Sequence, residues 1–597
     1  MRDAETVLNV IRDRGIRGLR LDEDVYRQLF NPRLYLRAYS RIYSNAGALT
    51  PGVTEETADG MSLAKIERII EDIRHERFRW TPVRRVYIEK KNSTKKRPLG
   101  LPSWADKLVQ EVIRSILDAY YEPRFSAHSH GFRPGRGCHT ALTEIYRTWK
   151  GTKWFIEGDI RGCYDNVDHD ILLSILREDI RDNRFLRLMD GLLKAGYCEQ
   201  WTHNPTLSGV PQGAIVSPLL SNLYLDRLDK FVETTLIPDY TRGEERRENP
   251  EYVKLVKRAW YLRSQGRHAE AEELSRQYHR MPSRDFHDPA YRRLLYVRYA
   301  DDFLLGFAGP VAEAREIKER LATFLREALK LDLSSEKTLI THATTQAATF
   351  LGYEIAVAQE DSKRTHGQRT VNGVIQLRVP ATFVDERAAL YTRKGKPIHR
   401  PELMVNDDFT IVATYQSEYR GYVQFYSLAV NIATLNKLHW IMEGSLLKTL
   451  ANKHKATVEH IAVKLRKTVI FPHGPRKCLE VVVEREGKRP LVARFGGIPL
   501  KRNLKATIQD RSLLNWGPPR SELLKRLLAD TCEVCGAKGN IEVHHIRALK
   551  DVQVKGRKEK PAWMRTMSAR RRKTLMVCTE CHDAIQYGKP GKRQTSA

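Results

Sequence analysis

The most constraining feature of the chain is a pair of adjacent aspartates between two apolar runs. The stretch RRLLYVRYADDFLLGF at residues 292–307 places Asp301 and Asp302 between segments with the composition of buried strands. Adjacent aspartates usually cap helices or lie in solvated turns, but the apolar flanks favour a buried hairpin with an exposed turn. Two carboxylates held there need a strong compensating charge, and a divalent metal ion supplies it. The stretch therefore predicts a metal site at the tip of a hairpin.

A second apolar run ends on a further aspartate. In TKWFIEGDIRGCYDNVD, residues 152–168, a short predicted strand finishes at Asp159. Because divalent ions of this type take several oxygen ligands, Asp159 is the natural candidate for the third carboxylate.

Length and charge limit what kind of protein this is. A chain of 597 residues is too long for one hydrophobic core, so several domains are expected. Its 102 Lys and Arg exceed 73 Asp and Glu, giving a net charge of +29 and favouring a polyanionic partner such as nucleic acid. No run of 18 apolar residues, lipidation motif or secretory signal is visible, so no membrane partner and a cytoplasmic location are expected, with an organelle left open.

The periodicity changes along the chain. Residues 62–77 and 106–121 have helical spacing, and VRRVYIEKKNSTKKRPLGLP between them predicts a hairpin with a basic tip. Residues 237–293 are charged and rich in Pro and Gly, which indicates surface helices and loops inserted into a core fold. After about residue 400 the spacing is helical again, enough for about three helices.

Four of the eight cysteines form two Cys-x-x-Cys pairs near the C-terminus. In a cytosolic chain this spacing predicts metal binding before a disulfide. Four thiolates favour a closed tetrahedral zinc site, which would stabilise a small polar module. The predicted zinc ligands are Cys532, Cys535, Cys578 and Cys581.

Seven motifs occur in the order typical of one family of enzymes, and on them the chain resembles the reverse transcriptases of group II introns. They are RPLGLP (97–102), HGFRPGRGCHTAL (130–142), GDIRGCYDNVDH (158–169), GVPQGAIVSPLLSN (209–222), YADD (299–302), SSEKT (334–338) and FLGY (350–353).

This resemblance implies a polymerase site that holds two Mg²⁺ ions. One ion would lower the pKa of the primer 3′-hydroxyl, and the other would bind the triphosphate of a dNTP. The catalytic and Mg²⁺-binding residues implied are Asp159, Asp301 and Asp302, with Ile160 beside them. The implied nucleotide-binding residues are Lys95, Lys96, Arg97, Tyr164, Gln212 and Lys337. Tyr164 departs from the Phe common in the family, and it could instead be a packed core aromatic.

The helical region after residue 400 resembles the maturase region of the same family. The resemblance rests on YRGYVQFY (419–426) and SLLKTLANKHK (445–455) and implies binding of the parent intron RNA. The tyrosines recur at three and four residues, so they could form a helix core instead of stacking on bases. We expect packed aromatics, with RNA contacted by Lys448, Lys453, His454 and Lys455.

The cysteine-rich tail resembles an HNH nuclease. The pattern implies that His545 activates water, while His544 and His582 bind a catalytic Mg²⁺ or Mn²⁺ ion. The family's further histidine, four residues after His582, is Gln586 here, and glutamine is a poorer ligand. The alternative is a zinc module that binds DNA without cutting it.

The expected fold class is multidomain α+β. It combines a right-hand polymerase with fingers and palm, an α-helical thumb, a basic DNA-binding segment and a small zinc-stabilised ββα-metal domain. The expected boundaries are an N-terminal extension at 1–85, fingers and palm at 86–390, thumb or maturase domain X at 391–475, a DNA-binding region at 476–528 and an HNH domain at 529–597.

The leading hypothesis is a multifunctional retroelement enzyme: RNA-directed DNA polymerase, maturase and target-DNA nuclease. Its partners would be group II intron RNA, target DNA and dNTPs. A splicing cofactor with a vestigial polymerase is a second hypothesis, against which the intact Asp159, Asp301 and Asp302 argue. A reverse transcriptase of another system, such as a retron, is a third, and the maturase-like and HNH-like segments argue against it.

Overall fold

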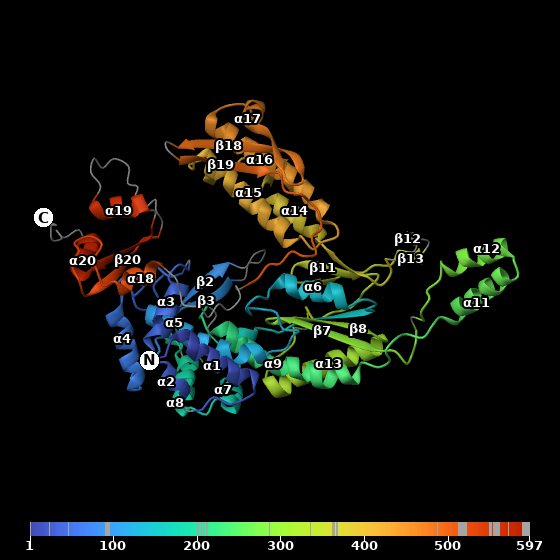
Figure 1. Cartoon of the computed structure of the whole chain (residues 1–597), viewed down its shortest axis with the longest axis horizontal. Coiled ribbons are helices and arrows are strands. Elements are labelled where there is room, and N and C mark those ends of the chain that lie inside the picture. Colours follow the sequence, from blue (N-terminus) through green and yellow to red (C-terminus); the bar gives the residue numbers. More distant parts are fainter. Residues whose placement is uncertain are drawn as a thin grey trace.

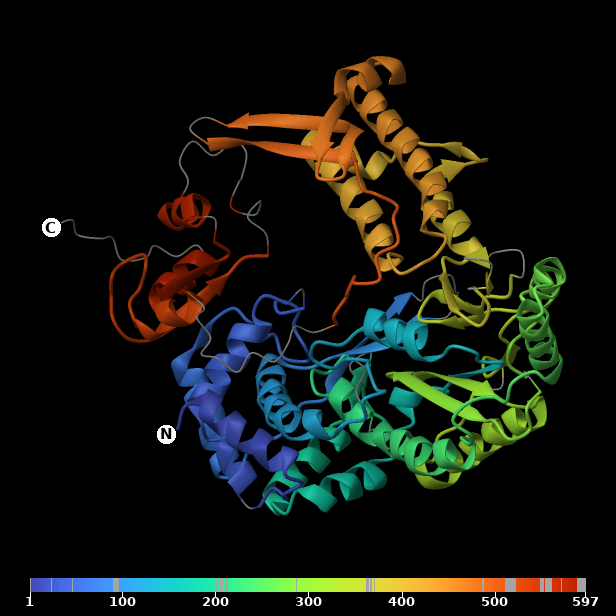
Figure 2. The same cartoon turned by 45° about the vertical axis from the view of Figure 1, so that its right-hand side comes forward.

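The structure is a computed structural model (Figures 1 and 2). It describes residues 2–22, 24–45, 47–89, 96–199, 202–204, 206, 208–210, 213–285, 287–334, 336–360, 364–365, 368–369, 371–485, 488–510, 522–547, 552, 561–570 and 572–587. Among these residues, no helix is both long and apolar enough to cross a membrane.

The first part of the chain is helical, as its periodicity predicts. It comprises α1 (Ala4–Ile16), α2 (Asp24–Gln28), α3 (Pro32–Ile42), the short strand β1 (Met61–Ser62) and α4 (Leu63–Arg74). Ser62 caps α4 by accepting a hydrogen bond from the Lys65 N–H. Helix α4 buries Ile66, Ile70 and Ile73, which recur at three and four residues. These helices pack around the long buried helix α5 (Trp104–Tyr121).

The predicted basic hairpin is present between α4 and α5. Strand β2 (Val83–Glu89) pairs antiparallel with β3 (Lys96–Leu101), which brings Glu89 opposite Lys96. The tip, including Lys95, lies outside the described residues. The sheet continues through β5 (Tyr197–Glu199) to β6 (Thr202–Asn204).

A four-stranded antiparallel sheet forms the centre of the molecule. Its order is β7 (Arg293–Tyr299), β8 (Asp302–Ala308), β4 (Trp154–Asp159) and β9 (Ile340–His342). One face packs on α9 (Ser217–Phe231) and α13 (Val311–Leu329), and the other on α6 (Cys138–Thr148), as Figure 1 shows. Both faces are buried, which explains the nearly continuous apolar runs around Asp301 and Asp302.

The charged insertion forms surface helices, as predicted. Helices α11 (Pro250–Ser264) and α12 (His268–Tyr278) make a hairpin that projects from the rest of the molecule in Figure 1. Helix α7 (His169–Asp179) packs on α8 (Asn183–Lys194) and on α9, and the short α10 (Ile237–Asp239) contacts β7.

The helical region after residue 400 forms a separate layer above the central sheet in both ribbon views (Figures 1 and 2). The three predicted helices are α15 (Asp408–Phe425), α16 (Leu435–His454) and α17 (Val458–Leu465), preceded by α14 (Ala381–Ala389). They share a core with the small sheet of β10 (Ala348–Phe350), β11 (Tyr353–Val357) and β14 (Ile375–Arg378).

A strand layer extends this helical region beyond the boundary expected at residue 475. Strands β17 (Arg466–Phe471), β18 (Gly474–Arg485) and β19 (Lys488–Gly496) form one sheet, so residue 475 lies inside a strand. Leu479 and Phe495 of this sheet are buried in the same core as α15 and α16. The chain thus stays with the helical layer as far as Gly496.

The C-terminal domain joins the N-terminal helices directly. Its elements are α18 (Glu522–Leu528), β20 (Ile541–His545), α19 (Ala562–Arg570), β21 (Thr574–Cys578) and α20 (Thr579–Tyr587). Strand β1 adds to its sheet in the order β1-β20-β21, with Met61 opposite Val543. The C-terminal domain thus shares a sheet and a hydrophobic core with the N-terminal helices.

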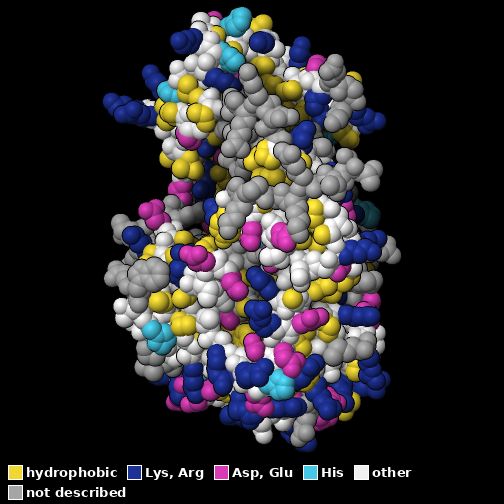
Figure 3. All heavy atoms as spheres, turned by 90° about the vertical axis from the view of Figure 1, so that its left-hand side faces the viewer, with side chains coloured by type: hydrophobic (Ala, Val, Ile, Leu, Met, Phe, Trp, Pro, Cys, Tyr) yellow, Lys and Arg dark blue, Asp and Glu magenta, His cyan; other side chains and the backbone are white. Residues whose placement is uncertain are grey.

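Basic side chains are spread over the molecule. On the face that carries the C-terminal domain, Lys and Arg occur on both the upper and the lower part, mixed with acidic side chains below (Figure 3). On this face, the basic side chains are therefore not gathered in one patch.

A fully buried ion pair fixes the turn between β7 and β8. The Arg298 guanidinium on β7 donates to both carboxylate oxygens of Asp229 on α9, at 2.7 and 2.6 Å, and both side chains are completely buried. Arg298 also donates to the carbonyl oxygen of Ala300 at 2.9 Å and to Ser129 Oγ at 2.9 Å. Asp229 accepts a further hydrogen bond from the Tyr296 hydroxyl. The hairpin turn is thereby tied to a helix on one face of the sheet.

Removing one partner of this pair should cost far more stability than removing a surface carboxylate. Asp229→Ala leaves Arg298 charged and buried, which typically costs about 3–5 kcal/mol. Asp239→Ala breaks the half-exposed Arg320–Asp239 pair, whose atoms are 2.8 Å apart, and should cost about 0–1 kcal/mol. Chemical denaturation of the two variants checks this, and equal losses would contradict the role given to Arg298.

Candidate functional sites

Three carboxylates meet where two strands of the central sheet end. Asp159 is the last residue of β4 and pairs directly opposite Asp302, the first residue of β8. Asp301 lies in the turn before it, next to Ala300, which adopts a left-handed conformation with φ of +55°. The structure thus places the three aspartates predicted to hold metal ions at neighbouring strand ends, although their carboxylate oxygens do not all lie within 4.8 Å of one another.

The electrostatics of these carboxylates favour a bound cation. Burial raises the pKa of Asp302 to about 7, and the nearby Asp301 and Asp159 act in the same direction. The pKa of Asp301 is raised for the same reasons. Three close carboxylates cannot all be ionised without a compensating charge. Lys337 supplies part of it, with its Nζ 3.0 Å from both carboxylate oxygens of Asp159.

Two glycines in the sequence motifs allow backbone segments to approach this site. A Cβ on Gly131 would collide with the backbone N of Ala300, so the HGF segment packs directly on the hairpin turn. Gly209, with φ of +92°, lies where a Cβ would be 2.8 Å from the carbonyl oxygens of Tyr164 and Asp165. Both positions require glycine because a side chain would displace the hairpin turn at Ala300 or the 3-10 turn at Tyr164 and Asp165.

The predicted nucleotide-binding residues lie at two edges of the site. Arg97 is on β3, and its charge lowers the pKa of Asp301 against the larger effect of burial. Lys96 is exposed at the start of that strand. Tyr164 lies in the short 3-10 turn after β4, half-buried against the central core. Lys95 and Gln212 lie outside the described residues.

Ile160, predicted beside the metal-binding aspartates, follows Asp159 directly. Its side chain is buried, and its backbone forms a bridge to Leu333. Only its backbone carbonyl is therefore available as a ligand.

A segment far along the chain returns to this site. The Asp510 carboxylate accepts hydrogen bonds from the Tyr299 hydroxyl at 2.6 Å and from the Phe132 backbone N–H at 3.1 Å. Tyr299 is the first residue of the YADD motif. Nothing in the sequence around Asp510 resembles a motif, so this contact was not predicted.

The residues predicted to bind RNA lie along the end of α16 and already make contacts within the protein. Lys448 donates to the carbonyl oxygen of Pro397 at 2.8 Å. Lys453 and His454 both pair with the Asp408 carboxylate at the start of α15, at 2.6 and 2.7 Å. Lys455 ends the helix in a left-handed conformation and is exposed. The region therefore presents exposed cationic side chains, but two of them, Lys453 and His454, are paired with Asp408.

The tyrosines of the same region are mostly packed, as expected. Tyr415, Tyr419 and Tyr426 are buried in the core of the helical layer. The Tyr415 hydroxyl hydrogen-bonds to Ser445 Oγ at 2.8 Å and joins α15 to α16. These rings hold the helices together.

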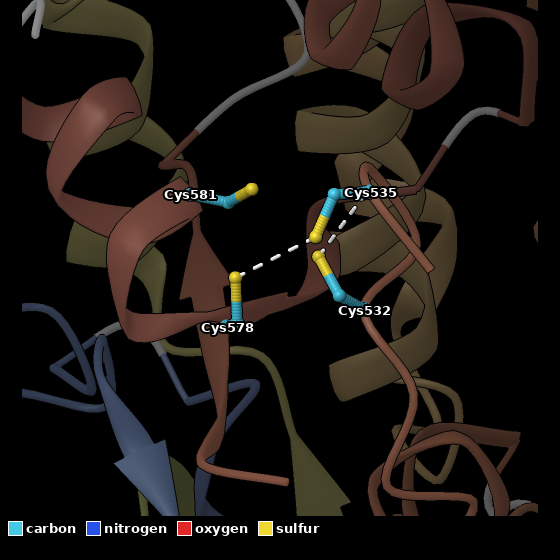
Figure 4. Close-up of side chains that lie close together, drawn as sticks. All are labelled: Cys532, Cys535, Cys578 and Cys581. Atoms are coloured by element: carbon cyan, nitrogen blue, oxygen red, sulfur yellow. Dashed lines mark hydrogen bonds between the residues drawn. The ribbon is translucent and has the colours of Figure 1, made fainter. Parts of the chain in front are cut away.

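The four C-terminal cysteines converge. Figure 4 shows the side chains of Cys532, Cys535, Cys578 and Cys581 gathered between the loop before β20 and the start of α20. All four sulfur atoms lie within 4.8 Å of one another, and Cys535 Sγ is 3.7 Å from Cys578 Sγ. Sulfur atoms about 2.3 Å from a tetrahedral zinc ion are about 3.8 Å apart. The cluster therefore fits a zinc ion.

A second cluster lies beside the first on the same small sheet. His544 and His545 end β20, and His582 lies on α20, as predicted. The carboxylate Oδ1 of Asp59, from the segment before β1, is 3.3 Å from His582 Nε2 and 3.5 Å from His544 Nδ1. Gln586 is exposed one turn beyond His582.

His545 faces the N-terminal helices. Its Nε2 is 2.9 Å from the hydroxyl of Tyr39 on α3. Burial lowers the pKa of His545 to about 4, so its imidazole is neutral near pH 7. A neutral imidazole can accept a proton from water.

Comparison with known proteins agrees with these sites. Residues 88–355 match the family described as "Reverse transcriptase (RNA-dependent DNA polymerase)", residues 379–478 match "Type II intron maturase" and residues 532–582 match "AI2M/AI1M-like, HNH endonuclease". The group II intron-encoded protein LtrA of Lactococcus lactis subsp. cremoris is 40% identical over 94% of both chains. The chain is a group II intron-encoded protein.

Other relatives show how far this similarity extends. An uncharacterised 91 kDa protein in the cob intron of Schizosaccharomyces pombe is 32% identical to this group II intron-encoded protein. The match covers 98% of the present chain and 73% of the relative. Protein YkfC of Escherichia coli is 31% identical over 55% of the present chain and 82% of its own. This group II intron-encoded protein is a multifunctional enzyme with reverse transcriptase, maturase and HNH endonuclease domains.

The sequence analysis missed two residues of the histidine cluster that come from a distant segment of this group II intron-encoded protein. Asp59 and Tyr39 lie about 500 residues before the histidines that they contact, and neither belongs to a motif. Glu542, whose Oε2 is 2.7 Å from His582 Nδ1, could have been found. It lies two residues before His544 on β20, so both side chains are on the same face of the strand.

Zinc content should depend on the cysteine cluster alone. Cys535→Ser removes one of four thiolates, so the protein should lose about one zinc ion and residues 522–587 should become sensitive to proteases. Cys198→Ser, at a half-buried cysteine of β5 outside the cluster, should change neither property. Elemental analysis and limited proteolysis check this, and unchanged zinc in Cys535→Ser would contradict the cluster's role.

Proposed function

We propose that Asp159, Asp301 and Asp302 hold two Mg²⁺ ions for RNA-templated DNA synthesis from dNTPs. The observation that carries this proposal is the placement of the three carboxylates at the neighbouring ends of β4 and β8, where burial disfavours the charge of Asp301 and Asp302. The ions would activate the primer 3′-hydroxyl and stabilise the leaving pyrophosphate. The carbonyl oxygen of Ile160 would complete the oxygen ligands.

The incoming nucleotide would lie between β3 and the 3-10 turn. Arg97, with Lys96 or Lys95, would bind its triphosphate, and Gln212 would shape the pocket. Tyr164 follows β4 and packs against the core on one side, so its ring would lie under the sugar and clash with a 2′-hydroxyl. Lys337 forms an ion pair with Asp159, which supports a role in protonating pyrophosphate as it leaves.

The parts of the chain would act as the fingers and palm (86–390), the thumb or maturase domain X (391–475), a DNA-binding region (476–528) and an HNH domain (529–597), after the extension at 1–85. The sheet that contains β18 supports carrying the thumb to Gly496. Contacts between α18 and the core around β20 and β21 support starting the HNH domain at Glu522.

The maturase part would bind the parent intron RNA and assist its splicing. Lys448, Lys453, His454 and Lys455 would contact phosphates, and the last three lie together at the exposed end of α16. Because Lys453 and His454 pair with Asp408, RNA phosphates would compete with this carboxylate for them.

The C-terminal domain would nick target DNA and so provide a primer for reverse transcription. His545 would accept the proton of the attacking water, and His544 and His582 would bind a Mg²⁺ or Mn²⁺ ion. The four-cysteine cluster would hold a structural zinc ion that fixes β20 against α20. The absence of the further histidine at Gln586 favours the alternative of a domain that binds DNA without cutting it. We place these activities in the cytoplasm.

Polymerisation should depend on Asp301, whereas splicing should not. Asp301→Asn removes one charge from a site whose metal ions contribute several kcal/mol, so primer extension should fall by roughly a thousandfold or more. Intron splicing should persist because the RNA-binding surface lies in another layer. The exposed substitution Asp239→Asn is the control. Near-normal primer extension by Asp301→Asn would rule out the metal assignment.

Nicking of one strand of a target duplex should depend on His545. His545→Ala removes the proton acceptor and should reduce nicking by roughly a hundredfold or more, while primer extension persists. The exposed His268→Ala is the matched control. If wild type and both variants bind target DNA but none cuts it at any Mg²⁺ or Mn²⁺ concentration, the domain only binds DNA.

A further inference from the structure

The N-terminal helices reach into the nuclease site. We infer that Asp59, from the segment before β1, is a carboxylate ligand of the nuclease metal ion together with His544 and His582. This inference rests on the proposed nuclease function of the C-terminal domain. It makes the metal site a composite of residues that lie almost 500 positions apart in the sequence.

The distances between the three side chains fit a shared ion. Asp59 Oδ1 is 3.3 Å from His582 Nε2 and 3.5 Å from His544 Nδ1, and all the candidate ligand atoms lie within 4.8 Å of one another. Two neighbouring ligand atoms that are each about 2.1 Å from an octahedral Mg²⁺ ion lie about 3.0 Å apart. Both separations from Asp59 Oδ1 are close to this value, so an ion can lie between Asp59 and each histidine.

His544 lacks the partners that a buried imidazole needs. Its side chain is 10% exposed, and neither ring nitrogen forms a hydrogen bond within the described part of the chain. Burying a polar group without a hydrogen-bond partner destabilises the folded state. A metal ion bound to Nδ1 would remove that cost, so the position is better explained by coordination than by packing.

Neighbouring groups hold the other two ligands in place. Glu542 Oε2 is 2.7 Å from His582 Nδ1, which leaves Nε2 directed at Asp59. The backbone N–H of His545 donates to Asp59 Oδ1 at 2.7 Å. Carboxylate–histidine pairs of this kind orient metal ligands in many proteins.

The pairing of β1 with β20 positions Asp59 and accounts for the irregular motif. Gly60 N–H donates to the Val543 carbonyl at 3.0 Å, and Ser62 lies opposite Glu542. Gln586 is exposed on α20, and Asp59 of the N-terminal segment offers a ligand in place of the histidine that is missing there. A carboxylate is a stronger ligand than a glutamine for Mg²⁺ or Mn²⁺.

The same docking builds the surroundings of His545. A cavity of about 330 Å³ beside His545 is lined from both sides, by Tyr43 and Asn45 of the N-terminal region and by Arg547 and Lys573 of the C-terminal domain. The two cations suit a DNA phosphate. The metal ligand and this cavity are therefore present only when the two parts of the chain are joined.

Iron-directed backbone cleavage of the full-length, zinc-loaded protein tests the inference. Fe²⁺ takes the place of Mg²⁺, and ascorbate with peroxide generates hydroxyl radicals that cut the chain next to each bound ion. Mass spectrometry locates the cuts. Cuts near Asp159 and Asp301 report the polymerase ions and serve as an internal control, and His544→Ala serves as the reference for a lost nuclease ion.

In wild type we expect cuts near Asp59 as well as near His544 and His582. Asp59→Asn keeps the oxygen that accepts from the His545 N–H but loses the charge. It should raise the Fe²⁺ concentration for half-maximal cutting at the nuclease site roughly tenfold or more. Glu55→Gln, on the same loop but exposed, should behave as wild type. Equal zinc content in all variants shows that the domain is folded.

Two other results would overturn the inference and are distinguishable. In the first, wild type is cut near His544 and His582 but not near Asp59, and Asp59→Asn behaves as wild type. This result would leave the nuclease metal site intact and exclude Asp59 as its ligand. Cuts confined to the polymerase site in wild type would remove the nuclease metal site itself, and with it the proposed nuclease function.

Discussion

The buried pair between Arg298 and Asp229 is the interaction on which the polymerase site depends. It joins a strand of the central sheet to the helix beneath it, and its remaining donors reach the turn that carries Asp301. Desolvating both charges is costly, and the cost is offset only because every donor of the guanidinium is directed at an oxygen. The turn is thereby fixed in one conformation, although two of its neighbouring carboxylates repel each other.

The candidate polymerase and nuclease metal sites follow one physical rule. Strand ends and short helices hold acidic or imidazole groups close together, where the groups repel each other or lack hydrogen-bond partners. A bound cation would compensate for this repulsion and for the missing partners. At the central sheet the groups come from neighbouring strands. In the C-terminal domain one group comes from the N-terminal segment, so that segment has two roles: it covers α5, and it extends the nuclease sheet through β1.

Local patterns predicted the elements that are determined locally. The apolar runs predicted the hairpin around Asp301 and Asp302, and the helical spacing after residue 400 predicted α15, α16 and α17. Residue 475, the boundary expected between the thumb and the DNA-binding region, lies inside β18, whose sheet packs in the core of the helical layer. Asp59 escaped notice because an isolated aspartate in a polar loop has no periodicity and no motif around it.

The sequence by itself determined the chemistry available: three aspartates at strand ends, four cysteines in pairs, and histidines on a strand and a helix. It also determined the family, because seven motifs occur in one order. Only the tertiary structure decided which distant groups meet, such as Asp59 with His544 and Asp510 with Tyr299. The physical reason is that such contacts depend on how whole layers dock on one another. Docking is stabilised by buried area and strand pairing over many residues, so no short stretch of sequence predicts it.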